Sequence, residues 1–168
     1  MRHPVRLLLL LLPLLLAGCS RSPESGPVEI RLDRDVCTRC RMVISELRFA
    51  AEVRGPVEGG GTRVWKFDDI GCAVLWLDEQ PWKDDPRVEI WVADQRDGHW
   101  IDARKAWYVP VTHSPMGYNL GARDTPAPGA MDFSAAVAHI RRVESGEHRH
   151  RGADAHVHEM PHAGMEAH

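Results

Sequence analysis

Residues 35–44, Asp35-Val36-Cys37-Thr38-Arg39-Cys40-Arg41-Met42-Val43-Ile44, place a Cys-x-x-Cys pair two positions before a methionine. Thiolate and thioether sulfurs are soft ligands, and together they favour Cu(I) over the harder divalent metal ions. A zinc knuckle would need a second pair of cysteines or histidines at matching spacing, which residues 28–145 do not offer. The stretch therefore predicts a Cu(I) site on which the surrounding domain is organised. A disulfide and a reduced structural pair are the alternatives that these ten residues leave open.

The residues around this stretch predict a mixed α+β domain of ordinary size. Alternating apolar residues and turn signals indicate short strands, and apolar residues at helical spacing indicate two helices. Asp68 is expected to cap the first helix, and Asp132 the second. The expected strands cover residues 28–32, 49–54, 62–67, 88–93, 107–111 and 118–122, and the expected helices residues 68–80 and 132–143.

The expected elements form a weak internal repeat. Met42 precedes a strand, a turn region and the helix opened by Asp68, and Met116 precedes a strand, a loop and the helix opened by Asp132. If a pseudo-twofold axis relates the two halves, both methionines occupy equivalent loop positions and face one another. Coincidence is the alternative explanation.

The N-terminus resembles a bacterial lipoprotein signal. A basic region precedes the leucine-rich residues 7–16, which are too few for a membrane-spanning helix of ~20 residues. The following Leu16-Ala17-Gly18-Cys19 is similar to a lipobox, whose cysteine is diacylated and becomes the new N-terminus. An ordinary secretory signal that happens to contain a cysteine is the alternative.

The chain is therefore expected to divide into four segments. They are a signal peptide at residues 1–18, a lipidated tether at 19–27, a copper-binding domain at 28–145 and a disordered tail at 146–168. More than one acyl chain anchors a protein stably, so we expect an exported protein held on the periplasmic side of a membrane. Ser20, in place of an aspartate after the cysteine, points to the outer membrane.

The C-terminal tail differs in composition from the domain. It has almost no residues for a core, which predicts disorder. Imidazole binds copper, zinc and nickel alike, so a histidine-rich tract indicates unselective metal binding. Its metal-binding side chains are His148, His150, His156, His158, His162, His168, Met160 and Met165. No basic stripe indicates nucleic-acid binding, and the formal net charge is −3.

Two further segments contain potential ligands. His113-Ser114-Pro115-Met116-Gly117 combines a fixed turn with a histidine and a methionine, both of which can bind copper. Cys72 lies among apolar residues of the first helix and is expected to be a buried structural thiol. Asp68 and Asp69 are interpreted as helix-cap charges, because no Ser-His-Asp arrangement or phosphate loop accompanies them.

Taken together, the motifs resemble the NosL family of copper-chaperone lipoproteins from nitrous oxide reductase gene clusters. They are the lipobox Cys19, Cys37-x-x-Cys40-x-Met42-x-Ile44, Phe67-Asp68-Asp69-Ile70-Gly71-Cys72, Pro115-Met116-Gly117 and the tail rich in histidine and methionine. The resemblance runs from the signal peptide to the tail. Arg41 departs from it, because glycine is frequent at that position in the family.

The resemblance implies a monomeric Cu(I) carrier without enzymatic activity. Its partners would be nitrous oxide reductase, whose copper–sulfide centre it would supply, and a membrane ABC-type assembly complex. The fold implied is two similar β-β-α-β-like units, akin to those of organomercurial lyase. The implied ligands are Cys40, Met42 and Met116, with Cys37 next and His113 weaker. Which of the two thiols binds copper is left open.

A thiol–disulfide oxidoreductase that uses Cys37 and Cys40 is the main alternative function. An exported Cys-x-x-Cys pair can cycle between thiol and disulfide. Thioredoxin-like sites, however, place the pair at a helix N-terminus, where the thiol pKa is lowered. Val43 and Ile44 do not indicate such a helix.

The lipobox generates a direct test of anchoring. The mature wild-type chain should begin at a lipidated Cys19 and fractionate with membranes, because its acyl chains insert in the bilayer. Cys19→Ser should release the chain or leave it unprocessed, as judged by membrane fractionation and intact mass. A wild-type mass that starts at any other residue would contradict the assignment.

Overall fold

The computed structural model describes residues 24–157. The expected signal peptide, Cys19 and the tail beyond residue 157 lie outside the described residues. None of the helices in the described part is long and apolar enough to cross a membrane.

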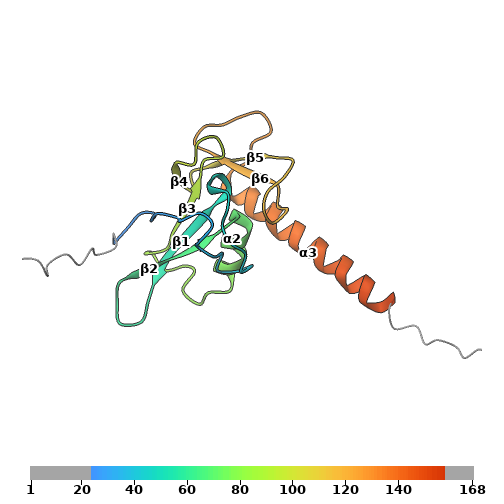
Figure 1. The fold of residues 1–168 in the computed structure, drawn as a ribbon, viewed down its shortest axis with the longest axis horizontal. Coiled ribbons are helices and arrows are strands. Elements are labelled where there is room, and N and C mark those ends of the chain that lie inside the picture. The colour runs from blue at the N-terminus through green and yellow to red at the C-terminus, as the bar shows by residue number, and fades with distance from the viewer. Residues whose placement is uncertain (1–23, 158–168) are drawn as a thin grey trace, which may run out of the picture.

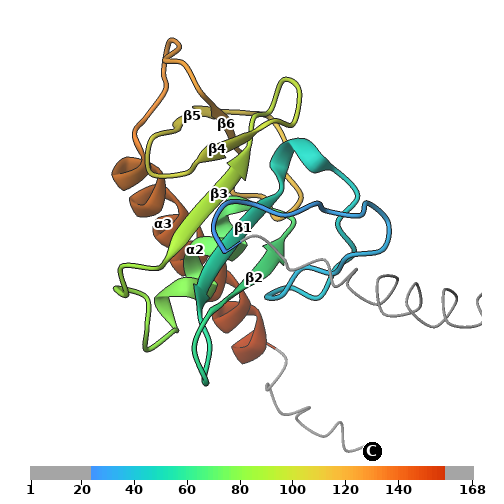
Figure 2. The ribbon, with the colours of Figure 1, turned by 90° about the vertical axis from the view of Figure 1, so that its left-hand side faces the viewer.

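The described chain folds as the predicted mixed α+β domain, with six strands in two antiparallel sheets and two α-helices (Figures 1 and 2). The larger sheet has the strand order β2-β1-β3-β4, and the smaller sheet pairs β5 with β6. The strands are β1 (Ala51–Pro56), β2 (Thr62–Phe67), β3 (Glu89–Ala93), β4 (Trp100–Asp102), β5 (Trp107–Pro110) and β6 (Leu120–Arg123). The helices are α2 (Ile70–Asp78), α3 (Phe133–Val157) and the 3-10 turn η2 (Leu47–Phe49).

Helix α2 packs on the large sheet through its apolar side chains. Ile70, Cys72 and Ala73 are buried in one core together with Phe67 of β2 and Ile140 of α3. Burial of these side chains supplies the main stabilising term for a domain of this size. Tight packing here also fixes the position of the residues at the start of α2.

Asp69 caps helix α2, and the prediction that Asp68 does so is wrong. The Asp69 carboxylate accepts a hydrogen bond from the Gly71 N–H at 2.9 Å. A side-chain oxygen at the N-cap satisfies one of the unpaired amides of the first turn. The Asp68 side chain is thereby free for a different contact.

Three other expectations for secondary structure are corrected. Residues 28–32 do not form a strand, because their backbone groups bond to side chains of the sheet, such as Val28 to Glu52 at 2.8 Å. Strand β4 pairs with β3 through Trp91 and Asp102, although no strand was expected there. Helix α3 continues to Val157, so the predicted disordered tail is helical over its first part.

The suspected repeat is visible in the order of the elements. The first half has the order β1-β2-α2-β3-β4, and the second has β5-β6-α3, without a closing strand in the described residues. Asp132 caps α3 by accepting the Ala135 N–H at 2.8 Å, as Asp69 caps α2. The second half has a separate sheet, so it reproduces the first only in part.

Two helical glycines provide a matched test of this packing. A Cβ at Gly71 would lie 2.1 Å from the Tyr118 ring, whereas one at Gly146 would meet nothing within 4 Å. Gly71→Ala should lower the free energy of unfolding by about 1–3 kcal/mol through overpacking. Gly146→Ala should raise it slightly, because alanine is the better helix former. Urea unfolding would measure both, and equal effects would contradict the close packing of Tyr118 on α2.

Candidate metal centre

The Cys-x-x-Cys stretch forms a tight hairpin. Val36 and Val43 pair as an antiparallel bridge, and the Cys37 N–H donates to the Met42 carbonyl at 2.8 Å. The Thr38 N–H donates to the Lys66 carbonyl at 2.8 Å, which fastens the hairpin to strand β2. The hairpin therefore holds Cys37 in the core and leaves Cys40 partly exposed.

Arg41 closes this hairpin in a left-handed backbone conformation, with φ of +68°. Its N–H donates to the Cys37 carbonyl at 3.1 Å, which completes the turn. A side chain in this conformation costs about 1–2 kcal/mol, a penalty that glycine avoids. Arg41→Gly would therefore remove this cost without changing the turn.

Three thiols and one carboxylate converge where the hairpin meets the start of α2. The sulfurs of Cys37, Cys40 and Cys72 and an oxygen of Asp68 all lie within 4.8 Å of one another. They come from the hairpin, the β2–α2 junction and the first turn of α2. These four side chains, termed the cysteine cluster, are close enough to hold a metal ion.

The thiols of the cysteine cluster are unequal. Cys37 accepts a hydrogen bond from the Cys72 thiol, and backbone N–H groups of Asp68 and Cys40 add to it, which together lower the pKa of Cys37 to about 6. The same hydrogen bond keeps the Cys72 proton in place and raises its pKa. Hydrogen bonding to a charged form stabilises that form. Of the three thiols, Cys37 is therefore the one that loses its proton most readily.

Cys40 is the accessible member, and it is held as a thiol. Its sulfur donates to both carboxylate oxygens of Asp68 at 3.4 Å. Desolvation raises the pKa of Cys40 to about 12, with smaller contributions from Cys37 and Asp68. A metal ion that binds Cys40 must displace this proton, as with any thiol ligand.

The Met116 loop is attached beside the cysteine cluster. Ser114 donates its hydroxyl to the Asp69 carboxylate at 2.6 Å, and the Met116 N–H donates to the same oxygen at 3.3 Å. Burial raises the pKa of Asp69 to about 6, while these hydrogen bonds oppose the rise. The loop thus docks on the residue next to Asp68, and Met116 packs partly buried against the core that contains Cys37 and Cys72.

A second contact joins the hairpin to helix α3. Arg39 forms an ion pair with Glu144 at 2.8 Å, and the Tyr118 hydroxyl donates to the other Glu144 oxygen at 2.8 Å. Both acceptor oxygens belong to one carboxylate, so the hairpin, the segment after Met116 and α3 meet there. This contact limits how far the hairpin can move from α2.

The structure brings together only part of the ligand set expected from sequence. Cys37 and Cys40 are in the cysteine cluster, and Met116 packs nearby. The side chain of Met42 is 50% exposed, and His113 is also exposed. His113 belongs to neither group of neighbouring His, Cys, Asp and Glu side chains found among residues 24–146.

Sequence analysis missed Asp68 and Cys72 as members of the cluster. Asp68 precedes the N-cap of α2 and Cys72 lies in its first turn, so helical spacing alone does not bring them together. Cys72 is buried as expected, but it hydrogen-bonds to Cys37 and is not an isolated core thiol. Its role depends on how the hairpin docks, which the spacing does not show.

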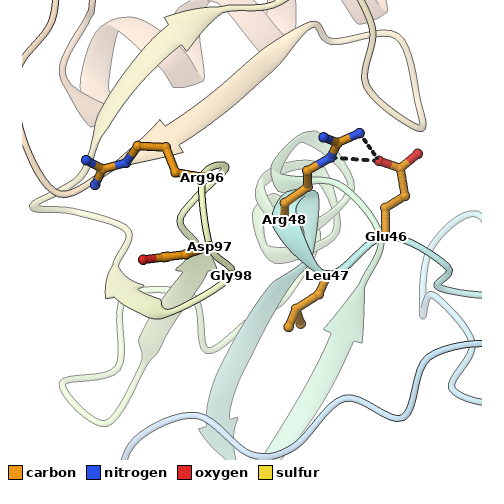
Figure 3. Close-up of a pocket in the computed structure, with 6 residues that line it drawn as sticks. All are labelled: Glu46, Leu47, Arg48, Arg96, Asp97 and Gly98. Carbon is orange, nitrogen blue, oxygen red and sulfur yellow. Dashed lines mark hydrogen bonds and ion pairs between the residues drawn. The ribbon is translucent and has the colours of Figure 1, made fainter.

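A second group of potential ligands is a weaker candidate for a metal site. Asp94, Asp97 and His99 lie close together, but Asp94 is already neutralised by Arg96 at 2.6 Å. The adjacent depression of about 390 Å³ contains charges of both signs (Figure 3). Its lining residues are Glu46, Leu47, Arg48, Arg96, Asp97 and Gly98.

No protein-family model and no curated protein matches this chain. The cysteine cluster must therefore be interpreted from its own geometry and chemistry.

The raised pKa of Cys40 predicts that this thiol is alkylated slowly in the reduced protein without added metal. With its pKa raised from 9.0 to about 12, Cys40 would be a thiolate in only ~10⁻⁴ of molecules at pH 8, roughly a thousandfold less than an ordinary thiol. Its iodoacetamide rate should therefore climb about tenfold per pH unit up to pH 10, as followed by peptide mass mapping.

Guanidinium-unfolded protein provides the control, because all its thiols should react at ordinary rates. Cys37 should stay unmodified in the folded protein, since burial blocks access to its thiolate. A folded-state rate for Cys40 that levels off below pH 9 would show that its pKa is not raised.

Proposed function

We propose that this protein is a membrane-anchored periplasmic Cu(I) metallochaperone that delivers copper for the maturation of nitrous oxide reductase. The observation that carries the proposal is the convergence of three sulfurs at one partly exposed position. Sulfur ligands in low coordination number suit Cu(I), and copper is here a cargo to be passed on.

The ligand set supports Cu(I) through Cys37, Cys40 and Cys72. Asp68 adds an oxygen, which would suit a four-coordinate zinc ion better than it suits Cu(I). We assign Asp68 a different role, in which its carboxylate accepts a hydrogen bond from the Cys40 thiol at 3.4 Å. The expected thioether ligands then act at the edge: Met116 beside the cluster and Met42 on its exposed side.

The unequal exposure of the three cysteines supports transfer. Cys37 and Cys72 are fully buried, so they retain copper against free chelators. Cys40 is the side from which an incoming ligand reaches the metal. As copper leaves, the Cys40 thiolate regains a proton and returns to its hydrogen bonds with Asp68.

The acceptor is proposed from the resemblance to the NosL family. On that basis copper passes, with a membrane ABC-type assembly complex, to the copper–sulfide centre of nitrous oxide reductase. The carrier is proposed to act as a monomer, without an enzymatic step and held by the lipid on Cys19.

Thiol–disulfide exchange at Cys37 and Cys40 is the competing function. An exchange enzyme needs an accessible thiolate. Here the thiol with a lowered pKa, Cys37, is fully buried, and the accessible thiol, Cys40, has a raised pKa. The pair also lies in a hairpin and not at a helix N-terminus. These four observations favour metal binding.

Substitutions should distinguish the contribution of the three sulfurs to metal affinity from that of Asp68. Under reducing, anaerobic conditions, competition with a chromophoric chelator should show that Cys40→Ser lowers Cu(I) affinity by more than ~100-fold, beyond the range typical of outer contacts. Cys37→Ser and Cys72→Ser should do likewise. Asp68→Asn should leave Cu(I) affinity within a few-fold while weakening Zn(II) binding by ~10-fold or more.

Substitution of the methionines should have smaller effects on Cu(I) affinity than substitution of the cysteines. Met42→Leu and Met116→Leu should each cost about tenfold or less in Cu(I) affinity. Met131→Leu is the matched control, because Met131 packs on the same core but bridges to Tyr108 of β5. Cysteine variants that bind Cu(I) normally, or a wild-type protein that catalyses disulfide exchange without binding Cu(I), would refute the proposal.

A further inference from the structure

The chain enters the domain through a segment held almost entirely by side chains of the sheet. This N-terminal strap (residues 24–30) forms no strand. The Gly26 carbonyl accepts from Arg54 at 2.7 Å, and the Gly26 N–H donates to Glu89 at 2.7 Å. Further along, Val28 donates to Glu52 at 2.8 Å, and the Glu29 carbonyl accepts from Lys66 at 2.5 Å.

Buried charges hold the strap. The side chain of Arg54 is 2% exposed, and Glu52 is fully buried with one oxygen that has no hydrogen-bond partner among the described residues. Burial raises the pKa of Glu52 to about 7. Charged groups in such positions are often less stabilising than apolar residues of similar volume. The strap is therefore tied to the sheet by specific buried polar groups.

The strap runs beside β2 from one end to the other. Glu24 meets Thr62 at the start of β2 through a 3.2 Å hydrogen bond, and Glu29 meets Lys66 near its end. Cys40 then contacts Asp68, just beyond the strand. Six residue steps separate Thr62 from Asp68, so the cysteine cluster lies roughly 20 Å from the point where the strap begins.

The reach of the tether limits how far that point can lie from the lipid. Four residues lie between Cys19 and Glu24, and the five residue steps that join them span at most about 17 Å when fully extended. The β1–β2 turn adjoins Glu24. It consists of Val57, which is 37% exposed, Glu58 and three glycines. The turn therefore lies within tether reach of the acyl chains.

We propose that the β1–β2 turn faces the lipid surface and that the strap holds the cysteine cluster on the opposite, water-facing side of the domain. The inference rests on lipidation of Cys19, which is part of the proposed function. It adds that the anchor orients the domain, so that Cys40 is presented away from the membrane. Figure 2 shows β2 extending between the β1–β2 turn and the region of the hairpin.

A competing lipid-facing surface surrounds the hairpin. Leu32, Val36, Met42 and Val43 are between 41% and 50% exposed. If this surface lay in the bilayer, it would cover Cys40 and block copper exchange. The two orientations put opposite ends of β2 next to the lipid, so one measurement distinguishes them.

The test uses the full lipidated protein in phosphatidylethanolamine–phosphatidylglycerol vesicles that contain an acceptor-dye lipid. A donor fluorophore on a genetically encoded azide residue replaces either Glu58 in the β1–β2 turn or Ser45 at the far end of the sheet. Both positions are exposed. With an offset of roughly 20 Å, energy transfer to the lipid should be at least about twofold greater from position 58. Equal transfer, or greater transfer from position 45, overturns the proposal.

Two variants test the tether and the strap. A sixteen-residue Gly-Ser insertion after Ser20 should reduce transfer from position 58, since a flexible linker of about that length adds roughly 20 Å of reach. Arg54→Met, confirmed as folded by urea unfolding, should reduce the difference in energy transfer between positions 58 and 45. An unchanged difference in both variants overturns the role of the strap.

Failure of lipidation is distinguishable from failure of copper binding. A chain without lipid would show no transfer from either position, which overturns this inference. Cu(I) titration of the same protein in solution would then still report on the cysteine cluster, because that measurement requires no membrane.

Discussion

The carboxylate of Asp69 is the interaction on which the arrangement of the domain depends. It caps α2 through Gly71 and accepts hydrogen bonds from Ser114 and Met116, so one buried group joins the two halves of the chain. Because the helix begins immediately after Asp69, Asp68 points to the hairpin and Cys72 falls in the first turn. Movement of this cap by one residue would separate the sulfurs.

Much of the fold was predictable because it depends on local patterns. Alternating residues located β1, β2, β3 and β5 to within a few positions, and helical spacing located α2. Residues 28–32 were expected to form a strand because their residues alternate, but the Val28 amide bonds to the Glu52 side chain in place of a neighbouring strand. Strand β4 was missed because it is short and depends on pairing with β3.

The site was predictable only as far as its sulfur-rich hairpin. The contact between Cys40 and Asp68 joins residues 28 positions apart, and that between Cys37 and Cys72 joins two separate elements. Neither follows from spacing, because each depends on the docking of the hairpin on β2 through Thr38 and Lys66. An aspartate before a helix is normally a cap. Here Asp69 is the cap, and the adjacent Asp68 contacts the Cys40 thiol.

The strap also determines how the domain would respond to mechanical load. A force applied through the tether reaches the bonds of Glu24 and Gly26 first, and only later those of Val28 and Glu29. The bonds would then break one after another, as in peeling, whereas paired strands pulled along their axes share the load. The first part to yield is thus the attachment itself. The sheet and the cysteine cluster at its far end would remain intact.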